Sequence, residues 1–248
     1  MSNGRHEQLR RPWAYLALMG ESIEEAIRAA RSEVEVGEAR APGEVEACLR
    51  LRHRVYVEER AWEADCGAGI ETDRYDRHSR HVLLRVRRCG TPVGTVRLVL
   101  PLPGAPGSGF PLQEAVHPAA LAPVPLHRAA EVSRFALARE RPPLSAGANS
   151  LLRLLLVQGV VGVCRENGLD WCVMAMERPL LRLLRASGIH CTEAGPQVEH
   201  HGLRQPAYFE VDGMLARMGR EHLALRDLVA SPLAPLARGS HEAGRRAA

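Results

Sequence analysis

Charged and aromatic residues that could take part in chemistry are concentrated in four short segments of the chain. The segments are R-H-R-V-Y-V-E-E-R-A-W at residues 52–62, E-T-D-R-Y-D at 71–76, G-T-V-R-L at 94–98 and E-V-S-R-F at 131–135. A carboxylate such as Glu131 can act as a general base if its pKa is raised toward neutrality. Ser133 follows two residues later on an expected strand, so both side chains share a face. The fourth segment is therefore the first candidate for a catalytic centre.

Ser133 could be interpreted as a nucleophile, but the sequence offers little to activate it. The local sequence fixes no histidine beside it, and the G-x-S-x-G nucleophile elbow is absent. We therefore expect Ser133 to act as a hydrogen-bonding group. Two roles stay open for Glu131: a general base, or a structural ion-pair partner of Arg134 or Arg97.

The basic residues exclude several kinds of enzyme. The 248-residue chain has 33 of them, and every one is arginine. Without lysine there is no Schiff-base or pyridoxal-phosphate chemistry and no Walker-type phosphate site. The net charge is only +4, and the arginines are scattered among carboxylates. Nucleic acid is therefore not expected as the main ligand.

The cysteines and apolar segments indicate a cytoplasmic protein without a metal. None of the six cysteines forms C-x-x-C, and the pair His200 and His201 has no third ligand at useful spacing. Reduced thiols of this kind are typical of the cytosol. The apolar stretch at residues 13–20 is too short to span a membrane and lacks the features of a signal peptide.

Apolar periodicity predicts a chain of alternating helices and strands. Helices are expected at residues 21–31, 44–60, 146–167 and 177–187, and strands at 33–38, 81–87, 93–100, 131–138, 171–176, 197–201 and 207–211. Residues 63–80 form a long polar loop, which is typical of a functional segment, and 101–128 an irregular insertion. We expect an N-terminal extension with a short helix at 1–30, one catalytic domain at 31–228 and a disordered tail at 229–248.

This order of elements predicts an α/β fold in which helices flank a mixed β-sheet. It resembles the architecture of the GCN5-related N-acetyltransferase superfamily. Element order alone does not separate this architecture from several other mixed folds.

The four segments resemble those of the acyl-homoserine-lactone (autoinducer) synthases, in the same order and with similar spacing. The matching residues are Arg52, Val55, Tyr56 and Trp62, then Asp73, Tyr75 and Asp76, then Arg97 and Leu98, and finally Glu131, Ser133, Arg134 and Phe135. Tyr56 stands where that family usually has phenylalanine. The resemblance covers residues 33–140.

The second half of the chain is instead similar to exosortase/PEP-CTERM-associated acyltransferases, which are related to N-acyl amino acid synthases. The residues that carry this likeness are L-L-R-A-S-G-I-H at 183–190, G-P at 195–196, H-G-L-R-Q-P at 201–206 and V-D-G-M-L-A at 211–216.

The resemblance implies aminolysis of an acyl thioester, with Glu131 as the base and Arg134 and Ser133 beside it. Backbone N–H groups of a splayed strand would hold the oxyanion. Arg52, Asp73, Asp76, Arg97 and Arg134 would form an interior charge network that shapes the acceptor site, and Tyr56, Trp62 and Phe135 would contact substrate. Each aromatic residue could equally be ordinary core.

The resemblance also implies an acyl-carrier-protein thioester as the acyl donor. Relatives in the wider superfamily bind coenzyme A at a glycine-rich turn before the long helix, whereas residues 141–150 contain only Gly147. A helix N-terminus there could still bind phosphate, so acyl-CoA stays possible. No bound cofactor is expected.

Three functions fit the sequence. The first is an N-acyltransferase that moves a fatty acyl chain from acyl carrier protein to the amine of an amino acid or related small molecule. The second is an acyl-homoserine-lactone synthase that uses S-adenosylmethionine as acceptor. The third is a non-enzymatic regulator that binds acyl groups or a partner.

Overall fold

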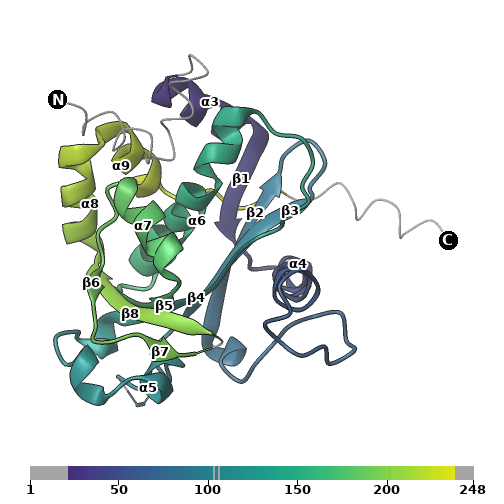
Figure 1. Ribbon diagram of the computed structural model, residues 1–248. Coiled ribbons are helices and arrows are strands. Elements are labelled where there is room, and N and C mark those ends of the chain that lie inside the picture. Colours follow the sequence, from purple (N-terminus) through teal and green to yellow (C-terminus); the bar gives the residue numbers. More distant parts are fainter. Residues whose placement is uncertain (1–21, 103, 106, 201, 238–248) are drawn as a thin grey trace, which may run out of the picture.

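A single mixed β-sheet organises the computed structural model, which describes residues 22–102, 104–105, 107–200 and 202–237 (Figure 1). The strands are β1 (Val34–Glu38), β2 (Ser79–Val86), β3 (Pro92–Val99), β4 (Ala129–Leu137), β5 (Trp171–Met176), β6 (Thr192–Glu193), β7 (Val198–Glu199) and β8 (Leu203–Glu210). Their order is β1-β2-β3-β4-β5-β8-β6, and β7 pairs with β8. All neighbours are antiparallel except β4 and β5, which are parallel. The predicted α/β class with a central mixed sheet is confirmed.

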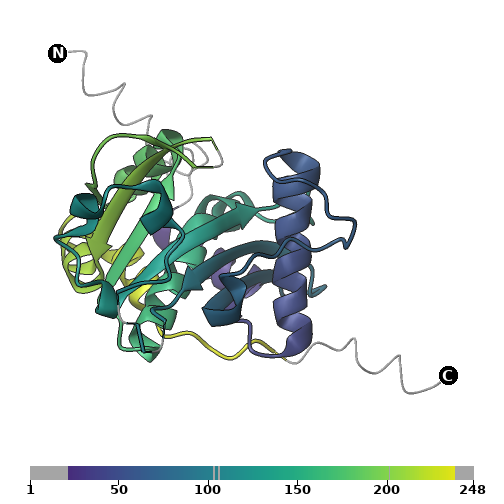
Figure 2. The ribbon, with the colours of Figure 1, turned by 90° about the horizontal axis from the view of Figure 1, so that it is seen from below.

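Helices cover both faces of this sheet (Figures 1 and 2). They are α3 (Ile23–Glu33), α4 (Pro42–His53), α5 (Leu112–Ala115), α6 (Ala146–Glu166), α7 (Arg178–Ala186), α8 (Val211–Glu221) and α9 (Leu223–Ala230). Helix α4 lies on one face, and the long helix α6 lies on the other together with α3. The main apolar core fills the space between α6 and the sheet.

Helix α6 is apolar because it is the central helix of that core. It begins where the Ser145 hydroxyl accepts a hydrogen bond from Ala148 N and ends before Gly168, whose φ of +63° suits glycine. By length and composition it could span a membrane, but 83% of its apolar window is buried inside the protein. Such burial is expected of a core helix.

The predicted helix at residues 21–31 is present as α3, but the domain boundary drawn after residue 30 falls inside it. Ser22 and Glu25 form a capping box at its start. Ala26 and Ala30 are completely buried in the main core. This helix is therefore part of the packed domain, and residues 1–21 of the expected extension lie outside the described chain.

The C-terminal region departs most from expectation. No element was predicted between residues 212 and 228, yet α8 and α9 occupy this stretch. The expected disorder from residue 229 is wrong for residues 229–237. Leu236 is buried against Gly37 and Leu83, and Ala237 N donates to Glu35. Apolar burial of one leucine beside edge strand β1 orders this segment.

The other predicted elements agree apart from their ends. The expected helix at 44–60 begins as α4 and continues with a π-helical turn, Arg54–Glu59. The insertion at 101–128 is mainly irregular, with α5 and two short 3₁₀ turns. The two last strands were expected at 197–201 and 207–211, but β7 and β8 lie at 198–199 and 203–210, and β6 was not predicted.

Candidate active site

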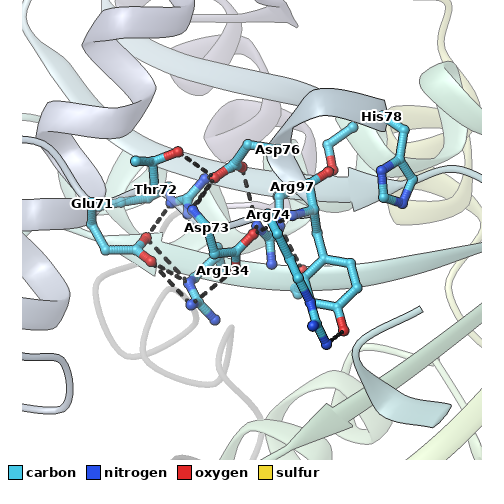
Figure 3. A network of polar contacts seen from close by, with 12 residues as sticks. Glu71, Thr72, Asp73, Arg74, Asp76, His78, Arg97 and Arg134 are labelled. Atoms are coloured by element: carbon cyan, nitrogen blue, oxygen red, sulfur yellow. Dashed lines mark hydrogen bonds and ion pairs between the residues drawn. The ribbon is translucent and has the colours of Figure 1, made fainter. Parts of the chain in front are cut away.

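Three arginines and three carboxylates form a charge network on the α4 face of the sheet (Figure 3). Arg52 comes from α4 and its side chain has no exposed surface. Its Nε donates to Glu71 Oε2 at 2.5 Å, and its Nη1 donates to Asp76 Oδ1 at 2.6 Å. A buried guanidinium needs such partners because unpaired burial of a charge costs several kcal/mol.

Arg97 and Arg134 extend this network across two strands. Arg97 on β3 donates from Nη1 to Asp73 Oδ1 at 2.6 Å and to Asp76 Oδ1 at 3.1 Å, and from Nε to Ser133 Oγ at 3.0 Å. Arg134 on β4 donates from Nε and Nη2 to Glu71, at 3.0–3.2 Å. Ser133 thus accepts a hydrogen bond, as the sequence analysis expects.

Mutual pairing keeps these carboxylates ionised. Burial alone would raise the pKa of Asp76, but the hydrogen bonds and charge of Arg52, followed by the charge of Arg97, hold that pKa well below its ordinary value. The same balance lowers the pKa of Glu71, through Arg52 and Arg134, and the pKa of Asp73, through Arg97. The network is therefore a rigid, fully charged wall rather than a source of protons.

Glu131 lies outside this pairing. It is 2% exposed, and its Oε2 accepts a hydrogen bond from Leu112 N at 2.8 Å. Within the described residues it forms no ion pair, so the alternative pairing with Arg134 or Arg97 is not observed. Burial raises the pKa of Glu131 to about 8, although the Leu112 N–H and the charges of Arg97 and Arg134 act in the opposite direction. A carboxyl group with this pKa is matched to proton transfer near neutral pH.

Strands β4 and β5 separate immediately beyond Glu131. Their parallel pairing runs from Ala129 with Trp171 to Val132 with Met174 and then stops, although β4 continues to Leu137. A register shift against β3 lies in the same stretch, where Arg134 has a φ of +52°. The bulge and the gap leave backbone on the β5 side of β4 without a neighbouring strand.

A cavity of about 330 Å³ occupies this opening. One end is lined by Glu131, Ser133, Arg134, Tyr56 and Trp62. The other end is apolar and runs between α6 and α7. Its lining there comprises Val157, Val160, Leu180, Leu183, Leu184, Ile189, Met174 and Phe209. The cavity therefore joins a buried carboxyl group to a compartment suited to a hydrocarbon chain.

Aromatic and cationic side chains surround the polar end of the cavity. The Tyr56 and Trp62 rings are tilted, with centroids 5.6 Å apart. Arg60 and Arg204 lie over the Trp62 ring at 4.8 and 5.0 Å, and Arg134 lies over Tyr56 at 5.5 Å. Tyr56 OH donates to Phe135 O at 3.4 Å, so the aromatic wall is tied to the bulged strand.

The residues singled out from the sequence therefore gather in two adjoining places. Arg52, Asp73, Asp76, Arg97 and Arg134 form the network, and Tyr56, Trp62, Glu131, Ser133, Arg134 and Phe135 line the cavity. Three participants were not predicted from the sequence: Glu71, which pairs with two of the arginines, the Leu112 N–H, and His81.

His81 is a buried neutral group beside the network. Its Nε2 lies 3.6 Å from Asp76 Oδ1, and its Nδ1 has no hydrogen-bond partner in the described chain. Burial, followed by the charge of Arg52, lowers the pKa of His81 to about 4. Glu71 was detectable as the first residue of the second segment, whereas nothing local marks His81 or Leu112.

Comparisons with known proteins agree with this geometry. The acetyltransferase (GNAT) domain matches residues 51–141. An acyl-homoserine-lactone synthase of Acinetobacter baumannii is 28% identical over 152 residues, which are 58% of this chain and 79% of that protein. Solved structures include TofI in a ternary complex with an inhibitor and MTA, with a TM-score of 0.57, 26% identity and coverage of 78% of this chain and 96% of that one.

Two further structures share the fold. MesI, a CoA-dependent acyl-homoserine lactone synthase, has a TM-score of 0.58 and 23% identity, and the match covers 76% of this chain and 95% of that one. FeeM, an N-acyl amino acid synthase from uncultured soil microbes, has a TM-score of 0.51 and 16% identity, with coverage of 74% and 93%.

Fold, site and sequence relatives together define an acyltransferase. The protein has a GNAT-like fold and is homologous to acyl-homoserine-lactone synthases. This result sets aside the non-enzymatic interpretation. Groups of three or more His, Cys, Asp or Glu side chains that could hold a metal ion are not found among the described residues.

Proposed function

We propose that the protein is an N-acyltransferase that transfers a fatty acyl chain from an acyl-carrier-protein thioester to the amine of an amino acid or related small molecule. The observation that carries this proposal is the cavity between β4 and β5, which joins the buried Glu131 carboxyl group to an apolar compartment beneath α6 and α7. This arrangement supplies a base and a hydrocarbon site in one continuous space.

The apolar end of the cavity suits the acyl chain. Val157 and Val160 on α6 face Leu183 and Leu184 on α7 across it, and Val160 is only 2% exposed. Burying a chain there removes its apolar surface from water, which contributes roughly 0.8 kcal/mol of favourable free energy per methylene group. A chain of several carbons would therefore be held firmly with its thioester at the open ends of β4 and β5.

The bulged part of β4 suits the thioester carbonyl. Backbone N–H groups that face a gap rather than a strand can donate to the oxyanion of a tetrahedral intermediate. The residues concerned, 133–136, line the cavity beside Glu131. We assign the oxyanion contact to this stretch of backbone.

The proposed reaction uses Glu131 as general base, directly or through a water molecule. The ionised carboxylate takes a proton from the acceptor ammonium or amine, and the nitrogen attacks the thioester carbon. This attack forms the C–N bond of a tetrahedral intermediate, which collapses as the C–S bond breaks, and the departing thiolate takes up the proton held by Glu131 and leaves as a thiol. Arg134 and Ser133 keep the groups around the base in position through their hydrogen bonds to Glu71 and Arg97, and they do not exchange protons.

The acceptor would bind at the polar end. Tyr56 and Trp62 provide aromatic walls, and Arg52, Asp73, Asp76, Arg97 and Phe135 shape or support this side. Glu63 and Glu177 also line the cavity here. Glu63 pairs with Arg134 and Glu177 pairs with Arg204, so an ammonium group of the acceptor would bind by replacing one of these arginine partners.

Basic side chains near the start of α6 support a phosphate-bearing donor. Arg153 lines the cavity, and burial together with the charges of Arg141 and Arg60 lowers its pKa. No ion pair to a carboxylate involves any of these three arginines in the described part of the chain. The phosphate of a carrier-protein prosthetic arm, or of CoA, would relieve their mutual repulsion. We favour acyl carrier protein because the glycine-rich CoA turn is poorly matched.

From the likeness of the second half of the chain to exosortase-associated acyltransferases, we also propose an association with an exosortase/PEP-CTERM system. We also propose a cytoplasmic location, where acyl carrier protein is available and the six cysteines stay reduced.

Acyl-homoserine-lactone synthesis is the second candidate function. The relative of Acinetobacter baumannii and TofI, at 28% and 26% identity, are the observations that favour it. The acceptor would then be S-adenosylmethionine, with a lactone closed after acylation.

Mass spectrometry of lipid extracts from cells that express the wild-type protein or Glu131→Gln tests both functions. New N-acyl amino acids that are absent with the variant would support the first function and give the acceptor and chain length together. New acyl-homoserine lactones would establish the second function instead. Purified enzyme assayed with acyl-ACP and acyl-CoA in parallel then identifies the donor.

A further inference from the structure

The described part of the irregular insertion contacts Glu131 through a backbone N–H group. Leu112 is the first residue of α5, and its N–H donates to Glu131 Oε2 at 2.8 Å. Glu131 Oε1 has no hydrogen-bond partner among the described residues. The Leu112 N–H therefore decides which carboxyl oxygen is engaged and which stays available to accept a proton.

A polar contact ties α5 to the loop that precedes β2, residues 63–78, which we call the acidic loop. Glu114 lies two residues after Leu112, and its Oε1 accepts a hydrogen bond from Tyr75 OH at 2.7 Å and pairs with Arg74. Tyr75 is in turn fixed next to the charge network, because its N–H donates to Asp73 Oδ1 at 2.8 Å. A continuous path of contacts thus links the network to α5 and α5 to Glu131.

Little else sets the position of α5 along this path. The helix has only four residues, and one turn of helix is not stable alone in water. Leu112 and Phe110 are buried, which holds the segment against the sheet but gives no directional constraint. Gln113 bonds within the insertion itself, to Gly107 O and Phe110 N. A second contact to the acidic loop, His78 Nε2 with Gly109 O at 3.1 Å, lies before the helix.

We propose that Tyr75 and Glu114 are positioning residues for the general base: their contact places α5 so that the Leu112 amide holds Glu131 Oε2 and leaves Oε1 to accept the proton. This inference rests on the proposed acyltransfer with Glu131 as base. Neither residue touches the cavity, so the effect passes through the backbone of α5.

Loss of the contact has a defined electrostatic consequence. The charged groups that act on Glu131 are Arg97 on β3, Arg134 on β4 and Asp73 in the acidic loop, while β5 presents the apolar Val173. The Leu112 N–H is a neutral donor that stabilises the carboxylate form, and the described part of the chain supplies no second one. If α5 shifts, the pKa of Glu131 rises further, and the pH at which the enzyme becomes active rises with it.

The experiment compares Tyr75→Phe, Glu114→Ala and the double variant with the wild-type enzyme, by measuring kcat and KM across pH 6 to 10. We expect kcat at pH 7 to fall about tenfold and the rising limb of the pH profile to move up by about one unit, with KM nearly unchanged. The double variant should be no worse than either single variant, because all three break one contact. Glu114→Gln, whose amide oxygen still accepts from Tyr75 OH, should recover part of the activity.

Glu46→Ala is the matched control. Glu46 is an exposed helical glutamate paired with an arginine, like Glu114, but it lies on α4 away from Glu131. A wild-type pH profile in Tyr75→Phe and Glu114→Ala, or an equal change in Glu46→Ala, would overturn the positioning role. Absence of acyl transfer by the wild-type enzyme with every amine tested would instead count against the proposed function itself.

Discussion

The Arg52 guanidinium and the Asp76 carboxylate form a two-point contact in the interior, with Nη1–Oδ1 at 2.6 Å and Nη2–Oδ2 at 3.2 Å. Arg52 adds Glu71 through Nε, so three of its nitrogens are engaged by carboxylates. This pair joins α4 to the acidic loop. Asp73 of the same loop pairs with Arg97. The charges therefore hold the polar end of the cavity in place.

Arg52→Ala is expected to destabilise the protein by about 3–5 kcal/mol, because the buried carboxylates of Glu71 and Asp76 each lose one of their two arginine partners. Arg50→Ala is the control on the same helix. Its side chain is 61% exposed and pairs only with Glu46, so its loss should change the unfolding free energy by less than about 0.5 kcal/mol. Urea unfolding of both variants measures the difference. Equal free energies of unfolding for the two variants would contradict a stabilising role of the buried Arg52–Asp76 pair.

Glu131 gives stability a dependence on alkaline pH. Its folded pKa of about 8 lies above the ordinary value of 4.5, so the folded state holds a proton that the unfolded state has already lost. That contribution is complete below pH 4.5 and is lost as pH rises through 8. Between pH 6.5 and 7 the wild-type protein should lose stability with a slope approaching about 1.4 kcal/mol per pH unit, and the slope should fall to about half of that value at pH 8.

The same slope should be missing from Glu131→Gln, which has no proton to release. Urea unfolding at half-unit steps of pH measures both proteins. Near pH 4.5 and below, the variant should be about as stable as the wild type, because amide and neutral carboxyl have similar size; at neutral pH it should be more stable than the wild type by roughly 3 kcal/mol. Parallel stability curves for the two proteins would show that the Glu131 carboxyl has an ordinary pKa.

The sequence predicted the order of strands and helices from β1 to α7 because each buried element has an apolar period of its own. It also predicted which polar segments meet, but on the strength of a family resemblance. Helix α8 was predictable and was missed: Val211, Met214, Leu215 and Met218 are spaced for one helical face, and all are buried.

Other contacts in the structure could not be predicted from the local sequence. The Leu112 N–H reaches Glu131 from an insertion whose prolines and glycines predict only irregular structure. Leu236 is ordered by the space above Gly37, which depends on the tertiary packing of β1. The burial of Arg52 likewise depends on the charge network. Its three carboxylates and three guanidinium groups come together only in the folded chain.

His81 gives stability a dependence on acidic pH of opposite sign. Its folded pKa of about 4 lies below the ordinary value of 6.5, so the unfolded state takes up a proton first as pH falls. Stability from this group is complete above pH 6.5 and declines toward pH 4. Glu131 partly cancels this decline in the wild-type protein, since its contribution grows as pH falls from 8 toward 4.5.

The cancellation makes a clear experiment possible. In Glu131→Gln the His81 slope should appear alone, as a loss of about 2–3 kcal/mol between pH 6.5 and 4. The stability of the double variant His81→Phe with Glu131→Gln should be flat from pH 6.5 to about 5.5, because below that pH the carboxyl groups of the unfolded chain begin to take up protons. A slope that persists in the double variant would assign the acid sensitivity to another group.

The length of the acyl chain should depend on the α6 wall of the cavity. Val157 and Val160 line its apolar end, so Val157→Phe and Val160→Phe should each fill part of the roughly 330 Å³ and shift the products toward shorter chains. Rejection of longer chains by one to several carbons corresponds to about 1–3 kcal/mol of lost binding, or a 10- to 200-fold preference. Mass spectrometry of the product mixture gives the chain-length distribution directly.

Val161→Leu is the control for this series, since Val161 is a buried residue of the same helix that does not line the cavity. It adds volume to the core without entering the acyl site and should leave the chain lengths unchanged while lowering stability slightly. A chain-length shift in Val161→Leu, or none in either phenylalanine variant, would mean that the hydrocarbon chain lies elsewhere. A shift confined to Val157 and Val160 would place the chain between α6 and α7, with its carbonyl at the opening of β4 and β5.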